Sequence, residues 1–384
     1  MSLIKSATVA TGLAMFSMFF GAGNVVFPLA LGQIAKDQNF YAILGMLITA
    51  VGVPFTGLIA MTLYDGNYEQ FFQRIGKIPG FIVSLIIIGL IGSFGALPRC
   101  IALSYSTAKI FLPMVSLPIF SAISCLIIWL FTVKRNSIID TLGYILTPLL
   151  IGSLAFIIIK GLLLSEGAPP AEHSEAAVFL KGLKDGYLTM DLLGAFFFSS
   201  VIINCLKNGI KTKERTPHQL VMTTLKASCI GAFLLSVTYI GFSYVSSAHS
   251  LALEGISSDE LITSIAVHIL GPNAAIIACS VVSLACLTTA IALAAVFAEF
   301  IHKDLGGNKI NYKFSLFITL VIAFFVSILN FNGIAAFLVP ILQICYPALI
   351  VLSLFNILHK LYGIKMVKIP VLATFLLSLW NHFS

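Results

Sequence analysis

The first apolar segment of the chain carries at its centre the sequence Phe19-Phe20-Gly21-Ala22-Gly23-Asn24-Val25-Val26-Phe27-Pro28, and the segment runs from Ser6 to Leu31. A helix that crosses a bilayer needs about 20 mainly apolar residues, and this segment has them. Two glycines, an asparagine and a proline interrupt it, however. A helix broken there exposes N–H and C=O groups that hydrocarbon cannot satisfy, so the break must face protein or a polar ligand. The segment therefore predicts a discontinuous membrane helix with a binding site at its break.

The composition of the chain is that of an integral membrane protein. Of its 384 residues, 59% are hydrophobic and 10% are charged, and the mean hydropathy is +1.04, which excludes an ordinary soluble domain. The apolar runs are longer than a barrel strand and show no alternation of period two, so the predicted fold class is all-α. We predict one transmembrane domain over residues 1–384 with eleven spans, near 6–31, 40–63, 80–112, 114–133, 140–164, 188–206, 221–247, 273–301, 314–330, 333–358 and 366–381.

The third predicted span is too long for one straight crossing. Pro98 lies within it and predicts a kink or a tilt. Sizeable polar interruptions occur only at 165–187, 207–220 and 248–272. The spans are therefore expected to form the whole protein, without a separate soluble domain.

Lysine and arginine residues set the predicted orientation, because cytoplasmic loops accumulate them. With a cytoplasmic N-terminus, the inner segments hold 16 of the 22 basic residues, and Arg99 lies within a span. The outer segments hold Lys36, Lys109, Lys160, Lys181 and Lys184. The net charge of +7 therefore reports topology and requires no nucleic-acid partner. A basic patch on the membrane surface is the second interpretation of this charge.

A second interrupted segment is predicted in the sixth span. It is entered through Gly186-Tyr187-Leu188-Thr189-Met190-Asp191 and continues with Gly194 and the paired Ser199 and Ser200. Five crossings separate this span from the first, so the two segments run in opposite directions. Interrupted segments in corresponding positions of two halves are typical of an inverted-repeat transporter with its site at mid-membrane. Close helix packing through small residues is the alternative explanation for the glycine and the serines.

The eighth span carries two adjacent hydroxyl residues, Thr288 and Thr289, in the run Ala285-Cys286-Leu287-Thr288-Thr289-Ala290. These hydroxyls can bond back to carbonyls of their own helix, which is the purely structural interpretation. They can also supply oxygen ligands to a small hard cation, completed by carbonyls released where the first span unwinds. The sequence leaves both interpretations open.

These motifs resemble the branched-chain amino acid:cation symporters, the carrier II (LIVCS) family of bacteria. The resemblance covers most of the chain and is carried by Phe19 to Asn24 with Phe27-Pro28, by Gly186 to Asp191 with Gly194, by Pro98-Arg99 and by Cys286-Leu287-Thr288-Thr289. It implies a multi-pass protein of the bacterial inner membrane that imports leucine, isoleucine and valine with sodium and is not an enzyme.

The resemblance also implies a fold and an arrangement of repeats. The family is placed in the amino acid-polyamine-organocation superfamily, with the LeuT-type five-plus-five inverted repeat and discontinuous spans one and six. Repeat one is then expected at about 6–164, repeat two at about 188–358 and an extra C-terminal span at about 366–381. The family usually has twelve spans, so the eleven predicted here leave the oligomer contacts, and the oligomeric state, undetermined.

By analogy with the LeuT-type arrangement, specific residues are expected to bind sodium and substrate. The sodium ligands carry over as the carbonyls of Ser17, Phe20 and Ala285 and the hydroxyls of Thr288 and Thr289. The substrate contacts carry over as Gly21, Ala22, Gly23, Asn24, Gly194, Phe197, Phe198 and Ser199. Sodium is the coupling ion, and no other cofactor is implied.

The chemistry at the two breaks suits a zwitterionic amino acid. Half-helix N-termini carry partial positive charge and can hold a carboxylate. Half-helix C-termini and freed carbonyls can hold an ammonium group and a metal ion. The wall from Phe196 to Phe198 suits an aliphatic side chain. A sugar or a nucleotide would need several amides and carboxylates in the spans, and these are missing.

Other functions remain open to different degrees. A proton-coupled or uncoupled amino acid exchanger on the same fold is the runner-up, with Asp191 or Glu299 as the titrating group. A membrane-embedded enzyme is disfavoured because all seven histidines lie in loops or at span ends. An ion channel is disfavoured because one pair of breaks supplies neither charge rings nor a carbonyl filter.

Arg99 and Asp191 are two ionisable residues predicted within spans, both toward the outer side. A charge in a bilayer is expensive and needs water or a counter-charge. One interpretation is that Asp191 favours a helix N-terminus while Arg99 reaches lipid phosphates. The other is that the two residues pair, directly or through water, as an outer gate over bound substrate.

Overall fold

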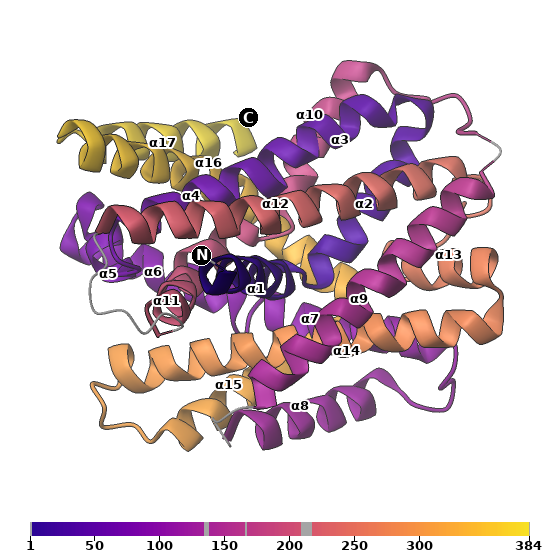
Figure 1. Cartoon of the computed structure of the whole chain (residues 1–384), viewed down its shortest axis with the longest axis horizontal. Helices are drawn as coiled ribbons and strands as arrows, with labels where there is room; N and C mark the ends of the chain where they lie inside the picture. The colour runs from indigo at the N-terminus through magenta and orange to yellow at the C-terminus, as the bar shows by residue number, and fades with distance from the viewer. Residues whose placement is uncertain (1, 134–137, 166, 209–216, 384) are drawn as a thin grey trace.

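The computed structural model describes residues 2–133, 138–165, 167–208 and 217–383, and every regular element within those ranges is helical. Most helices run along one common direction, horizontal in Figure 1. Five helical segments of the described chain are long and apolar enough to cross a membrane, and five shorter helices are also apolar. The all-α prediction is confirmed. The predicted inner loop 207–220 and the basic pair Lys134 and Arg135 lie mostly outside the described residues.

The first span is broken where its sequence predicts. Helix α1 (Ser2–Phe19) ends just before the break, and helix α2 (Ala22–Ala35) begins just after it. Gly21 is the N-cap of α2 in an extended conformation, and its N–H donates to Asn24 Oδ1 at 3.1 Å. This bond is one half of a capping box, in which a side chain of the first turn satisfies the N-cap N–H. Local sequence alone therefore ends one helix and starts the next.

The sixth span is also broken, but earlier than predicted. Helix α10 (Glu175–Tyr187) and helix α11 (Asp191–Asn208) are separated by Leu188, Thr189 and Met190. The predicted start of the span at 188 is wrong, because α10 is its first half and lies inside the predicted polar interruption 165–187. Gly194 lies within α11 and does not break it. Lysine and acidic residues spread along α10 lower its hydropathy, which is why the apolar pattern missed it.

The third span is interrupted one turn before the predicted position. Helix α6 (Lys77–Ile91) and helix α7 (Ala96–Lys109) are joined by four irregular residues, 92–95, and Pro98 lies in the first turn of α7. A proline lacks an N–H and collides with the carbonyl four residues earlier, here that of Phe94. The disruption therefore appears in the preceding turn, while Pro98 itself is helical.

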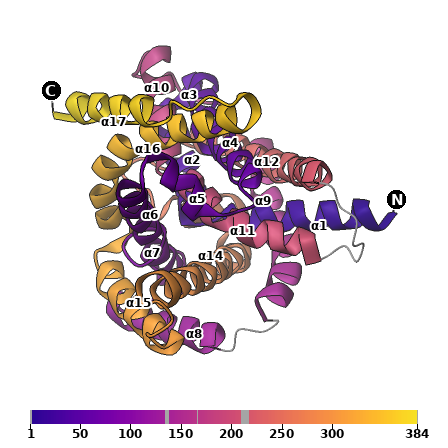
Figure 2. The ribbon, with the colours of Figure 1, turned by 90° about the vertical axis from the view of Figure 1, so that its left-hand side faces the viewer.

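The remaining helices correspond to the other predicted spans. They are α3 (Asn39–Leu47), η2 (Ile48–Gly52) and α4 (Val53–Leu63) in span two, α8 (Leu117–Val133) in span four, α9 (Ile138–Leu163) in span five, α12 (Pro217–Ala248) in span seven, α14 (Pro272–Phe300) with η4 (Ile301–Leu305) in span eight, α15 (Tyr312–Ser327) in span nine, α16 (Asn330–Tyr362) in span ten and α17 (Lys368–Phe383) in span eleven. Figure 2 shows α17 at the edge of the molecule beside α16, and none of its residues is buried.

Short helices occupy several connections. They are η1 (Lys36–Gln38), α5 (Tyr68–Phe72), η3 (Gln73–Ile75) and α13 (Leu261–Leu270). Helix α13 lies inside the predicted polar interruption 248–272, which is therefore partly ordered as a helix.

The helices pack in two groups that meet at the breaks. In the first group, α12 packs against α1 and α2, α3 packs against α10, and α4 packs against α11. In the second group, α14 packs against α7, α8 and α15. Contacts between the groups join α2 to α7, α1 to α14 and α11 to α6. Both breaks therefore lie along the boundary between the two groups.

Helices α3 and α10 are in close backbone contact. A Cβ atom at Gly182 would overlap the carbonyl oxygen of Ala42, and one at Gly45 would overlap that of Phe179. The Thr49 hydroxyl also donates to the Leu183 carbonyl at 2.9 Å. Small residues of this kind let membrane helices approach closely enough for van der Waals contact between backbones. The contact holds α10 in place although it is cut off from α11.

The Gly182→Val substitution is expected to lower the melting temperature of the purified protein. The added side chain has no room against the α3 backbone, and overpacking of this kind costs typically about 1–3 kcal/mol. Thermal unfolding in detergent measures the effect. Gly152→Val on α9 is the matched control, because a Cβ there meets nothing within 4 Å. Equal melting temperatures for both variants and the wild type would show that α3 and α10 are not tightly packed.

Candidate functional site

The two helix breaks border a cavity of about 40 Å³. Its walls come from α1, α2, α6, α7, α11 and α14 together with residues of both breaks. This volume holds a few water molecules, at roughly 10–15 Å³ of accessible space for each. The site is therefore narrow. Six of the eight predicted substrate residues line it, namely Gly21, Ala22, Gly23, Asn24, Gly194 and Phe198.

The other two predicted substrate residues lie away from this cavity. Phe197 packs on Tyr68 of α5, with the ring centroids 5.0 Å apart. The Ser199 hydroxyl is fully buried and donates to the Phe196 carbonyl at 3.0 Å. Phe196 itself contacts Phe71, at 5.1 Å between centroids. The predicted wall from Phe196 to Phe198 thus contributes only Phe198 to the cavity, because the break occurs several residues earlier than the sequence indicated.

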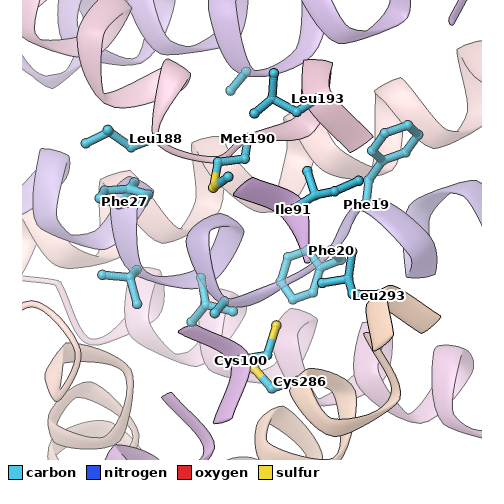
Figure 3. Close-up of a cluster of buried hydrophobic side chains, with 14 of the residues drawn as sticks. Phe19, Phe20, Phe27, Ile91, Cys100, Leu188, Met190, Leu193, Cys286 and Leu293 are labelled. Carbon is cyan, nitrogen blue, oxygen red and sulfur yellow. The ribbon is translucent and has the colours of Figure 1, made fainter. Parts of the chain in front are cut away.

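Apolar side chains from other elements complete the wall. Figure 3 shows Phe19 at the end of α1, Met190 at the second break, Ile91 at the end of α6 and Leu293 on α14 gathered around the two breaks. The Phe19 ring also meets that of Phe198 edge-on at 6.0 Å. Ile91 and Leu293 carry no signal in the sequence, since nothing distinguishes them from other residues in apolar helices.

Asn24 links the two breaks through a buried polar network. Its Nδ2 donates to Asp191 Oδ2 at 2.7 Å and also contacts the hydroxyl of Tyr239 on α12. The Tyr239 hydroxyl donates to the same carboxylate oxygen at 3.0 Å. Asn24, Asp191 and Tyr239 are 1%, 4% and 0% exposed. Tyr239 carried no sequence signal, because α12 also holds Tyr244 and several serines and threonines from which nothing in the sequence distinguishes it.

The sequence predicts Asp191 near the outer entrance, but the structure places it elsewhere. It is the first residue of α11, at the second break, and it lines the cavity. Arg99 lines the same cavity from the first turn of α7, and no ion pair joins the two among the described residues. The predicted pairing is therefore not direct in this structure, and pairing through water as part of an outer gate stays a prediction. Both charges lie at the level of the breaks because α10 supplies the outer half of this span.

Arg99 holds the second break in place. Its Nη1 donates to the Leu188 carbonyl at 2.9 Å and lies 3.6 Å from Met190 Sδ. The guanidinium stands over the rings of Phe27 and Phe331, at 5.2 and 5.3 Å from their centroids, a favourable cation–π arrangement. Met190 adopts a left-handed conformation with φ of 65°. Such a conformation is costly for a residue with a side chain and persists only where surrounding contacts enforce it.

Three of the five predicted cation ligands meet at the first break, namely the Phe20 and Ala285 carbonyls and the Thr289 hydroxyl. Thr289 Oγ1 lies 3.1 Å from the Ala285 carbonyl oxygen and 3.5 Å from that of Phe20. The Thr288 hydroxyl donates to the same Ala285 carbonyl at 2.8 Å. Ser17 lies half-buried in the last turn of α1, and no hydrogen bond joins it to the other four among the described residues. The two hydroxyls bond back to their own helix, but only Thr289 also reaches across to the break.

Solved structures with this arrangement are transporters. Mhp1, a nucleobase-cation-symport-1 family transporter, in a closed conformation with bromovinylhydantoin bound, aligns with a TM-score of 0.64 at 12% identity over 97% of this chain and 91% of that one. MhsT in complex with L-phenylalanine aligns with a TM-score of 0.57 at 14% identity over 97% and 98% of the two chains. At these identities the likeness shows the fold, and it confirms the predicted LeuT-type architecture with discontinuous spans one and six.

The sequence comparisons agree with the fold. The family model described as branched-chain amino acid transport protein matches residues 4–384. The branched-chain amino acid permease BrnQ of Bacillus subtilis strain 168 is 31% identical over 393 residues, which cover 98% of this chain and 87% of that protein. The chain therefore belongs to the branched-chain amino acid transport family, a family of multi-pass membrane transporters and not of enzymes.

Proposed function

We propose that this transporter imports leucine, isoleucine and valine together with sodium by alternating access. The family supports a branched-chain amino acid as the substrate class. The apolar cavity walls formed by Phe19, Phe198 and Leu293 suit an aliphatic side chain. The cavity lies between two packed groups of helices, and a movement of one group against the other would open it to either side of the membrane.

The position of Thr289 carries the proposal of sodium coupling. Its hydroxyl stands between the Phe20 carbonyl at the end of α1 and the Ala285 carbonyl of α14. Three oxygens from the two groups of helices thus converge at the boundary where the groups meet. Oxygen ligands of this kind suit a hard cation. A cation bound there would link the two groups and so favour one arrangement of the transporter over another.

We further propose a bacterial inner membrane with a cytoplasmic N-terminus. The charge distribution of the sequence supports this orientation. The predicted inner ends of spans two and ten lie together, since the Lys360 ammonium lies 4.4 Å from the centre of the Tyr64 ring. In Figure 1, α5 lies near the left-hand end of the molecule, and α13 lies near the right-hand end.

Coupling to protons is the second candidate, favoured by the buried position of Asp191. An ionisable side chain at mid-membrane depth is commonly part of a proton relay. Glu299, the other candidate, is half-buried and forms an ion pair with Lys303 at 2.6 Å. Asp191 is therefore the stronger of the two, because it lines the cavity and can report directly on the bound substrate.

Uptake by proteoliposomes with an imposed sodium gradient tests substrate and coupling together. We expect radiolabelled leucine, isoleucine and valine to accumulate, methionine to compete more weakly, and accumulation to stop when choline replaces sodium. A protonophore should leave the sodium-driven uptake unchanged. Accumulation that continues in choline and collapses with the protonophore would replace sodium by protons as the coupling ion.

A further inference from the structure

The cavity at the breaks carries one buried positive and one buried negative charge, and no direct ion pair joins them in the described part of the chain. Arg99 is 2% exposed and Asp191 is 4% exposed, and both line the cavity. Removing a charge from water without a partner is energetically costly in a membrane. A ligand that carries one negative and one positive group would neutralise both charges of this small cavity.

Arg99 has unused hydrogen-bonding capacity. A guanidinium has five N–H donors, yet among the described residues Arg99 makes a single hydrogen bond to oxygen, at Leu188. Its buried Nε has no partner. The Nη2 atom lies so close to Gly23 that a Cβ atom on that residue would overlap it. The guanidinium therefore stands directly over the first turn of α2, where backbone N–H groups also favour an anion.

Asp191 supplies the opposite charge on the other side of the break. Its Oδ2 accepts from Asn24 and Tyr239, which hold the carboxylate in one position. These two donors are neutral, and no cation forms a direct ion pair with Asp191 among the described residues. An ammonium group would provide that compensation through a charge-assisted hydrogen bond.

We propose that Arg99 and Asp191 bind the carboxylate and the ammonium group of the transported amino acid. This inference rests on the proposed function, because it concerns the same cavity. Binding of both charged groups would make the site selective for zwitterionic α-amino acids, whereas the apolar walls select only the side chain. A carboxylate can accept two parallel N–H bonds from a guanidinium, which fixes the orientation of the ligand as well as its affinity.

Ligands that lack one charged group test the proposal without any substitution. Leucinamide keeps the ammonium group and loses the carboxylate, while 4-methylpentanoate keeps the carboxylate and loses the ammonium group. Binding to the purified full-length wild type, measured by competition with radiolabelled leucine, is expected to be at least about tenfold weaker for each analogue, since each leaves one buried charge unmatched. Equal affinity of leucine and either analogue would overturn the corresponding half of the proposal.

Two variants assign the charges to their partners. Arg99→Gln should weaken leucine binding at least about tenfold and leave leucinamide binding nearly unchanged. Asp191→Asn should weaken leucine binding similarly and leave 4-methylpentanoate binding nearly unchanged. If Arg99 served only to hold the Leu188 carbonyl, Arg99→Gln would weaken leucine and leucinamide equally, and the assignment would be wrong. Arg99→Lys, which keeps the charge, should retain a preference for leucine over leucinamide.

A control separates charge removal in general from removal at the site. Lys109 ends the same helix, α7, and forms an exposed ion pair with Glu260 at 3.4 Å, a contact of little energetic weight. Lys109→Gln should bind leucine and both analogues as the wild type does. Each variant is compared only if it elutes as a single species in size-exclusion chromatography. If both site variants fail that criterion, the analogue affinities of the wild type decide the proposal.

The same measurements distinguish failure of this inference from failure of the proposed function. A panel of radiolabelled leucine, valine, alanine and methionine covers both. Tight binding of leucine with no effect of either charge substitution overturns the inference alone. Binding of alanine but not leucine, with the expected variant pattern, overturns the proposed substrate and supports the zwitterion site. A wild type that binds no amino acid of the panel overturns both.

Discussion

The Gly23→Val variant is expected to reach the membrane and to bind no leucine. A Cβ atom at this position would overlap the Arg99 guanidinium and lie 3.1 Å from Thr189 Cα in the second break. The two branches of valine would occupy the space between the breaks, which measures only about 40 Å³. Neither the backbone of the second break nor Arg99, which stands over the rings of Phe27 and Phe331, can yield without disturbing the site.

Equilibrium binding of radiolabelled leucine to the purified variant measures this effect. Gly152→Val, on α9 where a Cβ meets nothing within 4 Å, is the control for adding the same side chain elsewhere. Gly23 is the second residue of α2 and has ordinary helical geometry, so space and not backbone freedom requires glycine there. Leucine binding by Gly23→Val at wild-type affinity would place the substrate outside this cavity.

The Thr289→Ala variant is expected to require more than about tenfold higher sodium for half-maximal uptake. Loss of a hydroxyl ligand costs about 1–3 kcal/mol, and each 1.4 kcal/mol corresponds to about a factor of ten in affinity. Thr288→Ala should have a smaller effect, because the Thr288 hydroxyl contacts Ala285 but not the Phe20 carbonyl across the break. Initial rates of leucine uptake as a function of sodium concentration give both values.

Thr374→Ala provides the matched control for these two variants. The Thr374 hydroxyl also bonds back to its own helix, at 2.8 Å from the Pro370 carbonyl, but it lies on the peripheral α17. Its sodium dependence should equal that of the wild type. If Thr289→Ala shows the same sodium dependence as Thr374→Ala, both threonines serve only their own helix, and the sodium site must be sought elsewhere.

Much of the architecture could be predicted because the local amino-acid composition indicates where membrane helices lie. Long apolar runs report the spans, and Gly21 with Asn24 reports the first break, since the residues that end α1 and cap α2 are neighbours in sequence. The predictions failed where a helix was amphipathic, as in α10, or lay in a polar connection, as in α13. The hydropathy of a segment is an average over all its residues, so it does not reveal an apolar side that faces other helices.

The candidate site was predicted in part for the same reason. The predicted substrate residues Gly21 to Asn24 line the cavity, and so does Thr289, which was predicted as a cation ligand. The predicted register of the sixth span was wrong. Phe197 and Ser199 therefore lie outside the cavity, and Asp191 lines the cavity wall and not the outer entrance. Tyr239 joined the site from a distant helix without any local signal.

The sequence by itself determined the membrane class, the first break and the residue types offered to a cation. Only the tertiary structure decided the position of the second break, which contains neither glycine nor proline. There the Leu188 carbonyl accepts from Arg99 of α7, and the Leu192 N–H donates to the Tyr346 hydroxyl of α16 at 3.0 Å. Backbone groups released by a break in a membrane must find partners, and these partners come from helices far away in the chain.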